Sequence, residues 1–350
     1  MQRSKYIKRI LKAILFIALL VIFTKVLDAA FTLDENSTEN MLTSYSRTEE
    51  IDTVFIGNSV GEMMDTDMYS TLTGTHAFNM CTPSQSMEIS YRNLSMAASH
   101  HEIKNAVILM SLDMVNADDY SGIEQLYDRV VDSSSPWHER ILISLKRKYQ
   151  KSIDPDIFNT EESINVFIPW QNETAHGFKN ITDNLTRRFN RLIHNEPLGK
   201  DIAFDLNSIR YGRISGDLYK DEEALLEDDI KEASMLDIPT GMLSPGNLMR
   251  LAKICKFCSS NGIDLKVIVT PHRTDYYERY AAFREYSVIA DEYLSDFISK
   301  RGQMYYNTED DPDLHEILPD AFFYDKEHIE SKYFDKSTLY LYNIMNKMQQ

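Results

Sequence analysis

Apolar runs and stretches of helical periodicity alternate along two parts of the chain. Five segments predict strands, at residues 51–56, 75–79, 105–111, 265–270 and 304–307; the first contains an apolar run, and the third is apolar through its centre. Apolar residues at helical spacing predict helices at 87–99, 248–260, 280–300 and 331–348. Strands that alternate with helices are typical of a parallel sheet covered by helices on both faces. We therefore expect an α/β fold, a three-layer α/β/α sandwich built on a central parallel sheet.

The regular alternation lapses in the middle of the chain, over residues 118–245. Charged helical segments and polar loops fill this stretch, including a strongly acidic part at residues 221–232. We interpret it as a mainly helical insertion or cap within one domain that spans residues 51–350. The pattern leaves open whether the insertion is a lid, a glycan-binding face or a docking surface.

The first 31 residues have the pattern of a membrane segment. A basic start at residues 4–9 precedes an apolar run that only Lys12 interrupts before Phe23. If Lys12 and Lys25 reach the interfaces, the run extends to about 18 residues, close to the ~20 that a membrane-spanning helix needs. The basic flank predicts a cytoplasmic N-terminus and an extracytoplasmic remainder. We expect a transmembrane signal anchor at residues 1–31 and a polar linker at 32–50.

Two other interpretations of the N-terminal segment stay open. A cleaved signal peptide would need small residues before the cleavage site, and Asp28 fits poorly there if cleavage follows Ala30. A helix buried in the domain is disfavoured by the basic start and by the polar stretch after the run. The anchor and the cleaved signal peptide both imply an exported chain.

Charge and cysteine content narrow the function classes. The formal net charge of −17 argues against nucleic acid as the main partner, because phosphate recognition needs a basic face. Three cysteines cannot form a disulfide framework.

A serine follows the first predicted strand, at Gly57-Asn58-Ser59. Ligands of open parallel sheets bind beyond the carboxyl ends of the strands. A serine in a tight strand-to-helix turn can present its Oγ atom there, with backbone N–H groups beside it for a developing oxyanion. The alternative is an ordinary turn in which the serine caps the next helix.

An aspartate and a histidine lie three positions apart just before the last predicted helix, at Asp325-Lys326-Glu327-His328. The aspartate can fix the histidine tautomer while the other ring nitrogen faces a nucleophile. Chance and helix capping also produce such pairs. Together with Ser59, however, the pair predicts a Ser-His-Asp triad, which needs no cofactor and no metal.

These blocks resemble the SGNH (GDSL-type) hydrolases. The strand that ends in Gly57-Asn58-Ser59 matches their first block, and Asp325-Lys-Glu-His328 matches their last. The chain is more closely similar to the membrane-anchored cell-envelope branch, which includes the teichoic acid D-alanyl transfer protein and SGNH-like O-acyltransferases. Further similarities lie at residues 77–80 and 267–271. The resemblance covers about residues 50–116 and 245–345 and leaves the middle uncovered.

Two blocks depart from the family pattern. The glycine expected after the second strand and the Gly-x-Asn-Asp motif after the third are both missing. The first-block aspartate is Asn58 in this chain. Candidates for the oxyanion hole are therefore the Ser59 amide, the Cys81 amide, the Asn79 side chain and Asn116. Candidates that face the substrate are Asn58, Asp113 and His272.

The resemblance implies a membrane-anchored, extracytoplasmic serine esterase or O-acyltransferase that acts on acyl groups of cell-wall or exopolysaccharide glycans. The implied partners are an envelope glycan or an acylated carrier, and a membrane-bound O-acyltransferase. The missing motifs leave one alternative open, a catalytically inactive SGNH-like binding or scaffold protein of an envelope polysaccharide modification complex.

Overall fold

The computed structural model describes residues 2–31, 37–45, 48–116, 185–186, 189, 243–279, 281–323 and 325–349. The chain divides into two compact units, of which one holds the N-terminal helix α1 and the other holds the sheet. The predicted insertion at 118–245 lies almost wholly outside the described residues.

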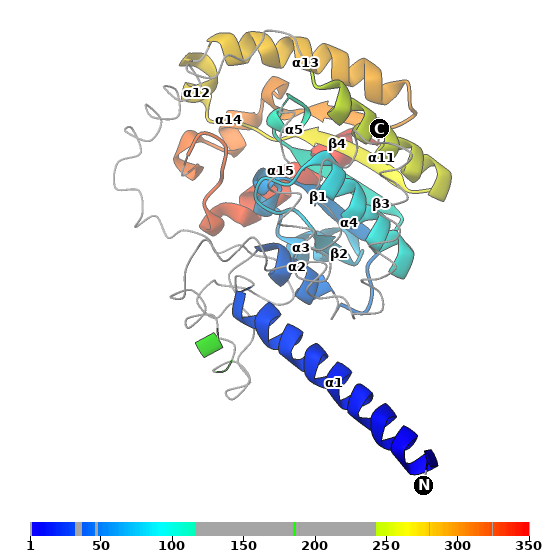
Figure 1. The fold of residues 1–350 in the computed structure, drawn as a ribbon. Coiled ribbons are helices and arrows are strands. Elements are labelled where there is room, and N and C mark those ends of the chain that lie inside the picture. Colours follow the sequence, from blue (N-terminus) through cyan, green and yellow to red (C-terminus); the bar gives the residue numbers. More distant parts are fainter. Residues whose placement is uncertain are drawn as a thin grey trace. The chain divides into compact units, whose positions relative to one another are not determined.

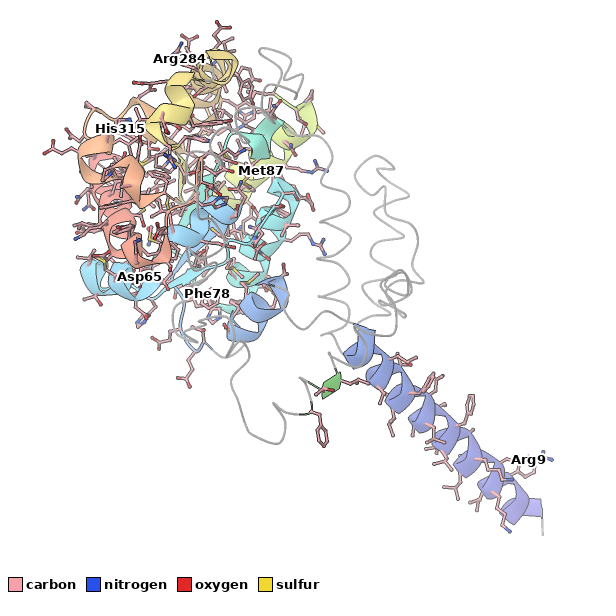
Figure 2. The ribbon with its side chains drawn as sticks, turned by 90° about the vertical axis from the view of Figure 1, so that its left-hand side faces the viewer. Arg9, Asp65, Phe78, Met87, Arg284 and His315 are labelled. Carbon is pink, nitrogen blue, oxygen red and sulfur yellow. The ribbon has the colours of Figure 1, made fainter. Side chains whose placement is uncertain are left out.

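The first unit contains α1, which runs from Gln2 to Phe31 where the sequence predicts a helix. Its large apolar side chains are exposed; they include Ile10, Ile14, Phe16, Leu19 and Phe23. Figure 2 shows side chains along the middle of α1, with Arg9 toward its N-terminal end. Within the described ranges, no helix is both long enough and apolar enough to cross a membrane, so the predicted transmembrane helix is not found.

A five-stranded parallel sheet organises the second unit, as the sequence predicts. The strands are β1 (Thr53–Gly57), β2 (Ala77–Asn79), β3 (Asn105–Met110), β4 (Asp264–Val269) and β5 (Met304–Asn307). Their order across the sheet is β2-β1-β3-β4-β5, and each neighbouring pair is parallel. β1 and β3 pair in register, with Thr53 opposite Asn105 and Gly57 opposite Leu109.

Alternate residues of each strand enter two separate hydrophobic clusters. In β1, Val54 and Ile56 pack in one cluster and Phe55 packs in the other. Successive side chains of a strand point to opposite faces of a sheet, so both faces are buried. This two-sided burial is the reason that β1 and β3 are continuous apolar runs through their centres.

Helices cover the two faces and complete the three layers. The face of Val54 is covered by α2 (Ser37–Tyr45), α4 (Met87–His100), α11 (Pro245–Asn261) and α13 (Ala281–Ser299). The face of Phe55 is covered by the 3₁₀ helix η1 (Ser59–Met63), α3 (Thr66–Thr73), α14 (Leu314–Ile317) and α15 (Phe334–Lys347). In Figure 2, Asp65 and His315 lie on one side of this unit and Met87, at the start of α4, lies toward the other.

The polar stretch predicted as a linker at 32–50 contains a helix, which corrects the prediction. α2 occupies Ser37–Tyr45, and its Met41 and Tyr45 are buried in the core. The Tyr45 ring packs edge-on against Phe78, with the ring centroids 5.7 Å apart. The two core residues lie four positions apart on one helical face, and the polar residues around them conceal that face in the sequence.

The strand order places a switch point between β1 and β3. β1 connects outward to β2 on one side, whereas the chain then crosses back to β3 on the other side. In open parallel sheets, ligands bind beyond the carboxyl ends of the strands at such a point. Ser59 follows β1 and Ser111 follows β3, so both lie at this edge.

Candidate active site

The backbone at the end of β1 requires glycine at position 57. Gly57 has a φ of +149°, and a Cβ atom built on it would lie 1.7 Å from the carbonyl oxygen of Leu109 in β3. The end of β1 therefore approaches β3 more closely than any side chain allows. The chain then turns directly into η1, which begins at Ser59.

Asn58 joins the ends of β1 and β3. Its Nδ2 atom donates to Ser111 Oγ at 2.7 Å, and its Oδ1 atom accepts the Ser111 backbone N–H at 3.3 Å. The side chain is buried, at 9% exposure. We predicted that Asn58 faces the substrate; its polar atoms are instead engaged inside the protein, because a buried amide must have partners.

The loop that carries Asp325 and His328 is closed at its base. Phe323 and Ile329 form an isolated antiparallel bridge, and both side chains are buried. Inside the loop, Asp325 Oδ1 accepts the backbone N–H groups of Glu327 at 2.9 Å and of His328 at 2.7 Å. These two bonds fix the carboxylate relative to the histidine that follows it.

Ser59, His328 and Asp325 form a continuous hydrogen-bonded set. His328 Nε2 lies 2.8 Å from Ser59 Oγ, and His328 Nδ1 lies 2.7 Å from Asp325 Oδ2. Both distances are within the range expected of a nucleophile, its general base and the carboxylate that orients the base. With the Nδ1 proton donated to Asp325, Nε2 can accept the serine proton.

The last helix is tied to the turn that carries Ser59. Ser337 Oγ, in α15, donates to the carbonyl of Met63 at 2.8 Å. The backbone N–H of Asp65 donates to Thr338 Oγ1 at 2.7 Å. Since α15 follows the Asp325–His328 loop, these bonds hold the histidine loop against the serine turn.

The electrostatic surroundings of His328 favour its protonated form. Burial alone would lower the pKa of His328, but the hydrogen bond with Asp325 and the charges of Asp325, Glu327 and Glu62 raise the pKa above its ordinary value. A base with a raised pKa accepts a proton from serine more readily, provided that it is neutral at the working pH.

Two candidates for the oxyanion hole are engaged elsewhere, which corrects the prediction. The Cys81 N–H donates to Asn79 Oδ1 at 2.9 Å, and Asn79 Nδ2 donates to the Gly61 carbonyl at 2.9 Å. Both residues are fully buried. Asn79 thus ties the chain after β2 to η1, because its amide can satisfy backbone groups of both.

The remaining candidates after β3 lie in α5 (Asp113–Asn116). Asn116 is half-buried, and its backbone N–H donates to the Leu112 carbonyl at 3.2 Å. The Asp113 side chain is outside the described part of the structure. The Ser59 amide belongs to the first residue of η1, where a helical N–H group has no acceptor within the helix.

His272 is buried and not exposed to a crevice, contrary to the predicted substrate-facing position. It follows β4, and its side chain is 4% exposed. Its Nδ1 atom lies 2.5 Å from Glu309 Oε1, and its Nε2 atom lies 3.6 Å from Glu327 Oε2. A histidine between two carboxylates is stabilised in the interior by their charge.

The sequence patterns gave no indication of two residues that adjoin the site. Ser111 is the partner of Asn58, and Glu327 lies inside the Asp325–His328 loop next to His272. Ser111 is the last residue of a predicted strand, which is the one signal that could have placed it at this edge. In the described residues, no group of three or more His, Cys, Asp or Glu side chains is arranged to hold a metal ion.

No family model matches the chain, and no curated protein matches it. Among solved structures, a candidate platelet activating factor from Streptococcus pneumonia matches with 10% identity and a TM-score of 0.40, over 94% of this chain and 98% of that one. A candidate acylhydrolase from Bacteroides fragilis matches with 8% identity and a TM-score of 0.37, over 88% and 95%. A GDSL-like lipase from Bacteroides thetaiotaomicron matches with 8% identity and a TM-score of 0.35, over 87% and 96%.

Likenesses this distant do not establish a shared activity. The parallel sheet with helices on both faces, and the serine, histidine and aspartate at its switch point, are features of this chain itself. In these features the chain resembles the SGNH hydrolases.

Proposed function

We propose that the chain is a serine esterase or O-acyltransferase that uses Ser59, His328 and Asp325. The observation that carries the proposal is the unbroken pair of hydrogen bonds, 2.8 Å from His328 Nε2 to Ser59 Oγ and 2.7 Å from His328 Nδ1 to Asp325 Oδ2. The positions of the two blocks at the carboxyl edge of the sheet add to it.

In the proposed reaction, His328 removes the Ser59 proton as Oγ attacks the carbonyl carbon of an ester. The tetrahedral intermediate collapses to an acyl-serine, and the alcohol leaves with the proton that His328 carries. Water then completes hydrolysis, or a sugar hydroxyl completes transfer. In both cases His328 takes the proton of the incoming hydroxyl and returns it to Ser59.

The Ser59 amide is the oxyanion donor that we propose. It lies at the start of η1, next to the reacting oxygen. The engagement of Cys81 and Asn79 removes two other donors, so the rest of the oxyanion hole is left unassigned.

The substrate class that we propose is an acylated glycan of the cell envelope, with an acylated carrier or a membrane-bound O-acyltransferase as the source of acyl groups. This part depends on the sequence resemblance to the membrane-anchored branch. We also propose that α1 attaches the chain to the cell membrane, with the catalytic domain on the extracytoplasmic side. The exposed apolar side chains of α1 support attachment, because an apolar surface of this extent is costly in water.

Labelling with a fluorophosphonate, which reacts with activated serines, tests the catalytic proposal. The wild-type chain should be labelled, and Ser59→Ala should not. Ser99→Ala is the matched control, because Ser99 is an exposed serine on α4. If folded wild-type protein is not labelled, the chain is a binding or scaffold protein and not a serine enzyme.

Fractionation of cells that express the full chain tests the attachment. Wild-type protein should stay with membranes after an alkaline wash, and a Leu15→Asp, Leu19→Asp variant should be released. Leu72→Asp, at an exposed leucine of α3, should behave as wild type. A membrane-impermeant labelling reagent should reach the protein in intact cells; protection of the whole chain from it would contradict the extracytoplasmic location.

A further inference from the structure

A buried ionic cluster lies behind the Asp325–His328 loop. It consists of His272, Glu309 and Glu327, which come from three segments: the chain after β4, the 3₁₀ helix η3 (Thr308–Asp310) after β5, and the loop itself. The side chains are 4%, 2% and 12% exposed respectively. Charges so deeply buried are costly unless they are paired, so the cluster is expected to have a function or a firm structural role.

We infer that His272 is a positioning residue, which holds the Asp325–His328 loop through Glu327 so that His328 faces Ser59. The inference rests on the proposed function, because it concerns the same site. The contact of His272 with Glu327 is the route by which His272 would act on the reaction.

His272 is fixed from one side by Glu309 and Tyr276. Glu309 Oε1 accepts both from His272 Nδ1, at 2.5 Å, and from the His272 backbone N–H, at 3.0 Å. The ring also stacks on Tyr276, with centroids 5.6 Å apart. One carboxylate oxygen and one aromatic face thus hold the imidazole in a single orientation.

The opposite edge of the His272 ring faces the Asp325–His328 loop. His272 Nε2 faces Glu327 Oε2 at 3.6 Å, and the neighbouring Arg273 backbone N–H donates to the Lys326 carbonyl at 2.8 Å. The chain after β4 therefore contacts both residues between Asp325 and His328. Glu327 N–H also donates to Asp325 Oδ1, so a displacement of Glu327 would move the carboxylate that orients His328.

The charge of the His272 ring is set by the two carboxylates beside it. Burial would lower the pKa of His272, but the charges and hydrogen bonds of Glu309 and Glu327 raise it to about 10, so the ring is an imidazolium at neutral pH. The other charged groups near it are Arg273, which pairs with Asp275, and Lys326, whose ammonium lies over the Tyr276 ring. A neutral ring at this place would leave the two carboxylates without their shared cation.

The test compares His272→Gln, Glu327→Gln and their combination. His76→Gln is the matched control, because His76 pairs with Glu50 at 3.3 Å on the exposed surface. With p-nitrophenyl acetate as substrate, His272→Gln and Glu327→Gln should each lower kcat about 10- to 100-fold, the range expected when a catalytic group is misplaced, and leave KM within about twofold. The two substitutions should not have additive effects on kcat, because both break the same contact between His272 and Glu327.

The pKa of His328, measured by NMR on histidine-labelled protein, gives a readout that needs no activity. Loss of the nearby His272 cation would by itself raise the pKa of His328. A loosened contact with Asp325 would lower it. We expect a fall in His272→Gln, and no change in His76→Gln.

Three results would overturn the inference: unchanged kcat in folded His272→Gln, additive effects in the double variant, or an unchanged or raised His328 pKa in His272→Gln. If His272→Gln does not fold, Glu327→Gln decides, and wild-type kcat in that variant overturns the inference. If the wild-type chain has no esterase activity, the proposed function fails, whereas the NMR measurement still decides the positioning role of His272.

Discussion

His328 Nε2 lies 2.8 Å from Ser59 Oγ, although 269 positions separate the two residues in the chain. Two features of the fold produce this contact. The parallel sheet brings the end of β1 to its carboxyl edge, and α15 is hydrogen-bonded to the Met63 carbonyl and the Asp65 N–H behind Ser59. The contact therefore depends on the docking of the last helix as well as on the two loops.

The pH dependence of Ser59 labelling should change when Asp325 is replaced by asparagine. His328 must be neutral to accept the serine proton, so the labelling rate should rise with pH through the pKa of His328. Asp325 raises that pKa by its hydrogen bond and its charge. In Asp325→Asn the midpoint of the pH profile should move to lower pH, and the plateau rate should fall by up to about 10⁴-fold, as when a triad aspartate is lost.

The measurement is the rate of fluorophosphonate labelling between pH 5 and 10 at intervals, with Asp320→Asn as the control. Asp320 accepts the Thr274 N–H at 2.8 Å, in a neighbouring loop. A midpoint that stays in place or moves upward in Asp325→Asn would contradict the assigned role of Asp325.

The sheet could be predicted from the sequence because burial on both faces leaves a direct mark. β1 and β3 are apolar runs through their centres, and the strand ends then locate the site by a general rule of parallel sheets. Ser59 could be singled out because it lies in the turn after the first strand. Asp325 and His328 could be singled out because their spacing allows them to pair within one loop.

Asn58 and His272 could not be assigned from the sequence because their buried partners are distant along the chain. Ser111 is 53 positions from Asn58, and Glu309 is 37 positions from His272. A polar residue after a strand has the same appearance in a sequence whether it faces a ligand or a buried partner. Only the fold decides, because the partner is tertiary.

Asn58, after the end of β1, should contribute more to the free energy of unfolding than Asn105 does at the start of β3. Asn58→Ala removes the acceptor of the buried Ser111 N–H, which should cost about 1–3 kcal/mol of the free energy of unfolding. It should also slow labelling of the adjacent Ser59. Asn105→Ala is the control, since Asn105 bonds Thr53 between the same two strands but is only partly buried.

Urea denaturation of both variants measures the stability effect, and labelling measures the effect on Ser59. Asn105→Ala should cost less stability and leave the labelling rate unchanged. Equal costs for the two variants would argue against a special role of the Asn58–Ser111 bonds at the site.

Gly57→Ala should disrupt the fold at the site. The new Cβ atom would meet the Leu109 carbonyl oxygen at 1.7 Å, and the φ of +149° is strained for alanine. We expect a loss of about 3 kcal/mol or more of stability, together with loss of Ser59 labelling. Gly74→Ala is the control: it has a φ of +71° but open space around it, and should cost about 1 kcal/mol. A Gly57→Ala variant as stable as Gly74→Ala would show that the strand ends separate easily.

The contribution of His272 to stability should decrease as the pH rises. Its folded-state pKa, about 10, lies above the value of about 6.5 expected in the unfolded chain. A group whose pKa is raised on folding stabilises the protein fully below the unfolded-state pKa, and the stabilisation is lost as the pH rises through the folded-state pKa.

The difference in urea midpoint between wild type and His272→Gln should therefore be largest near pH 6 and smallest near pH 10. The exposed His76→Gln should show little difference throughout. A His272→Gln difference that stays constant or grows with pH would mean that the ring is not an imidazolium between Glu309 and Glu327.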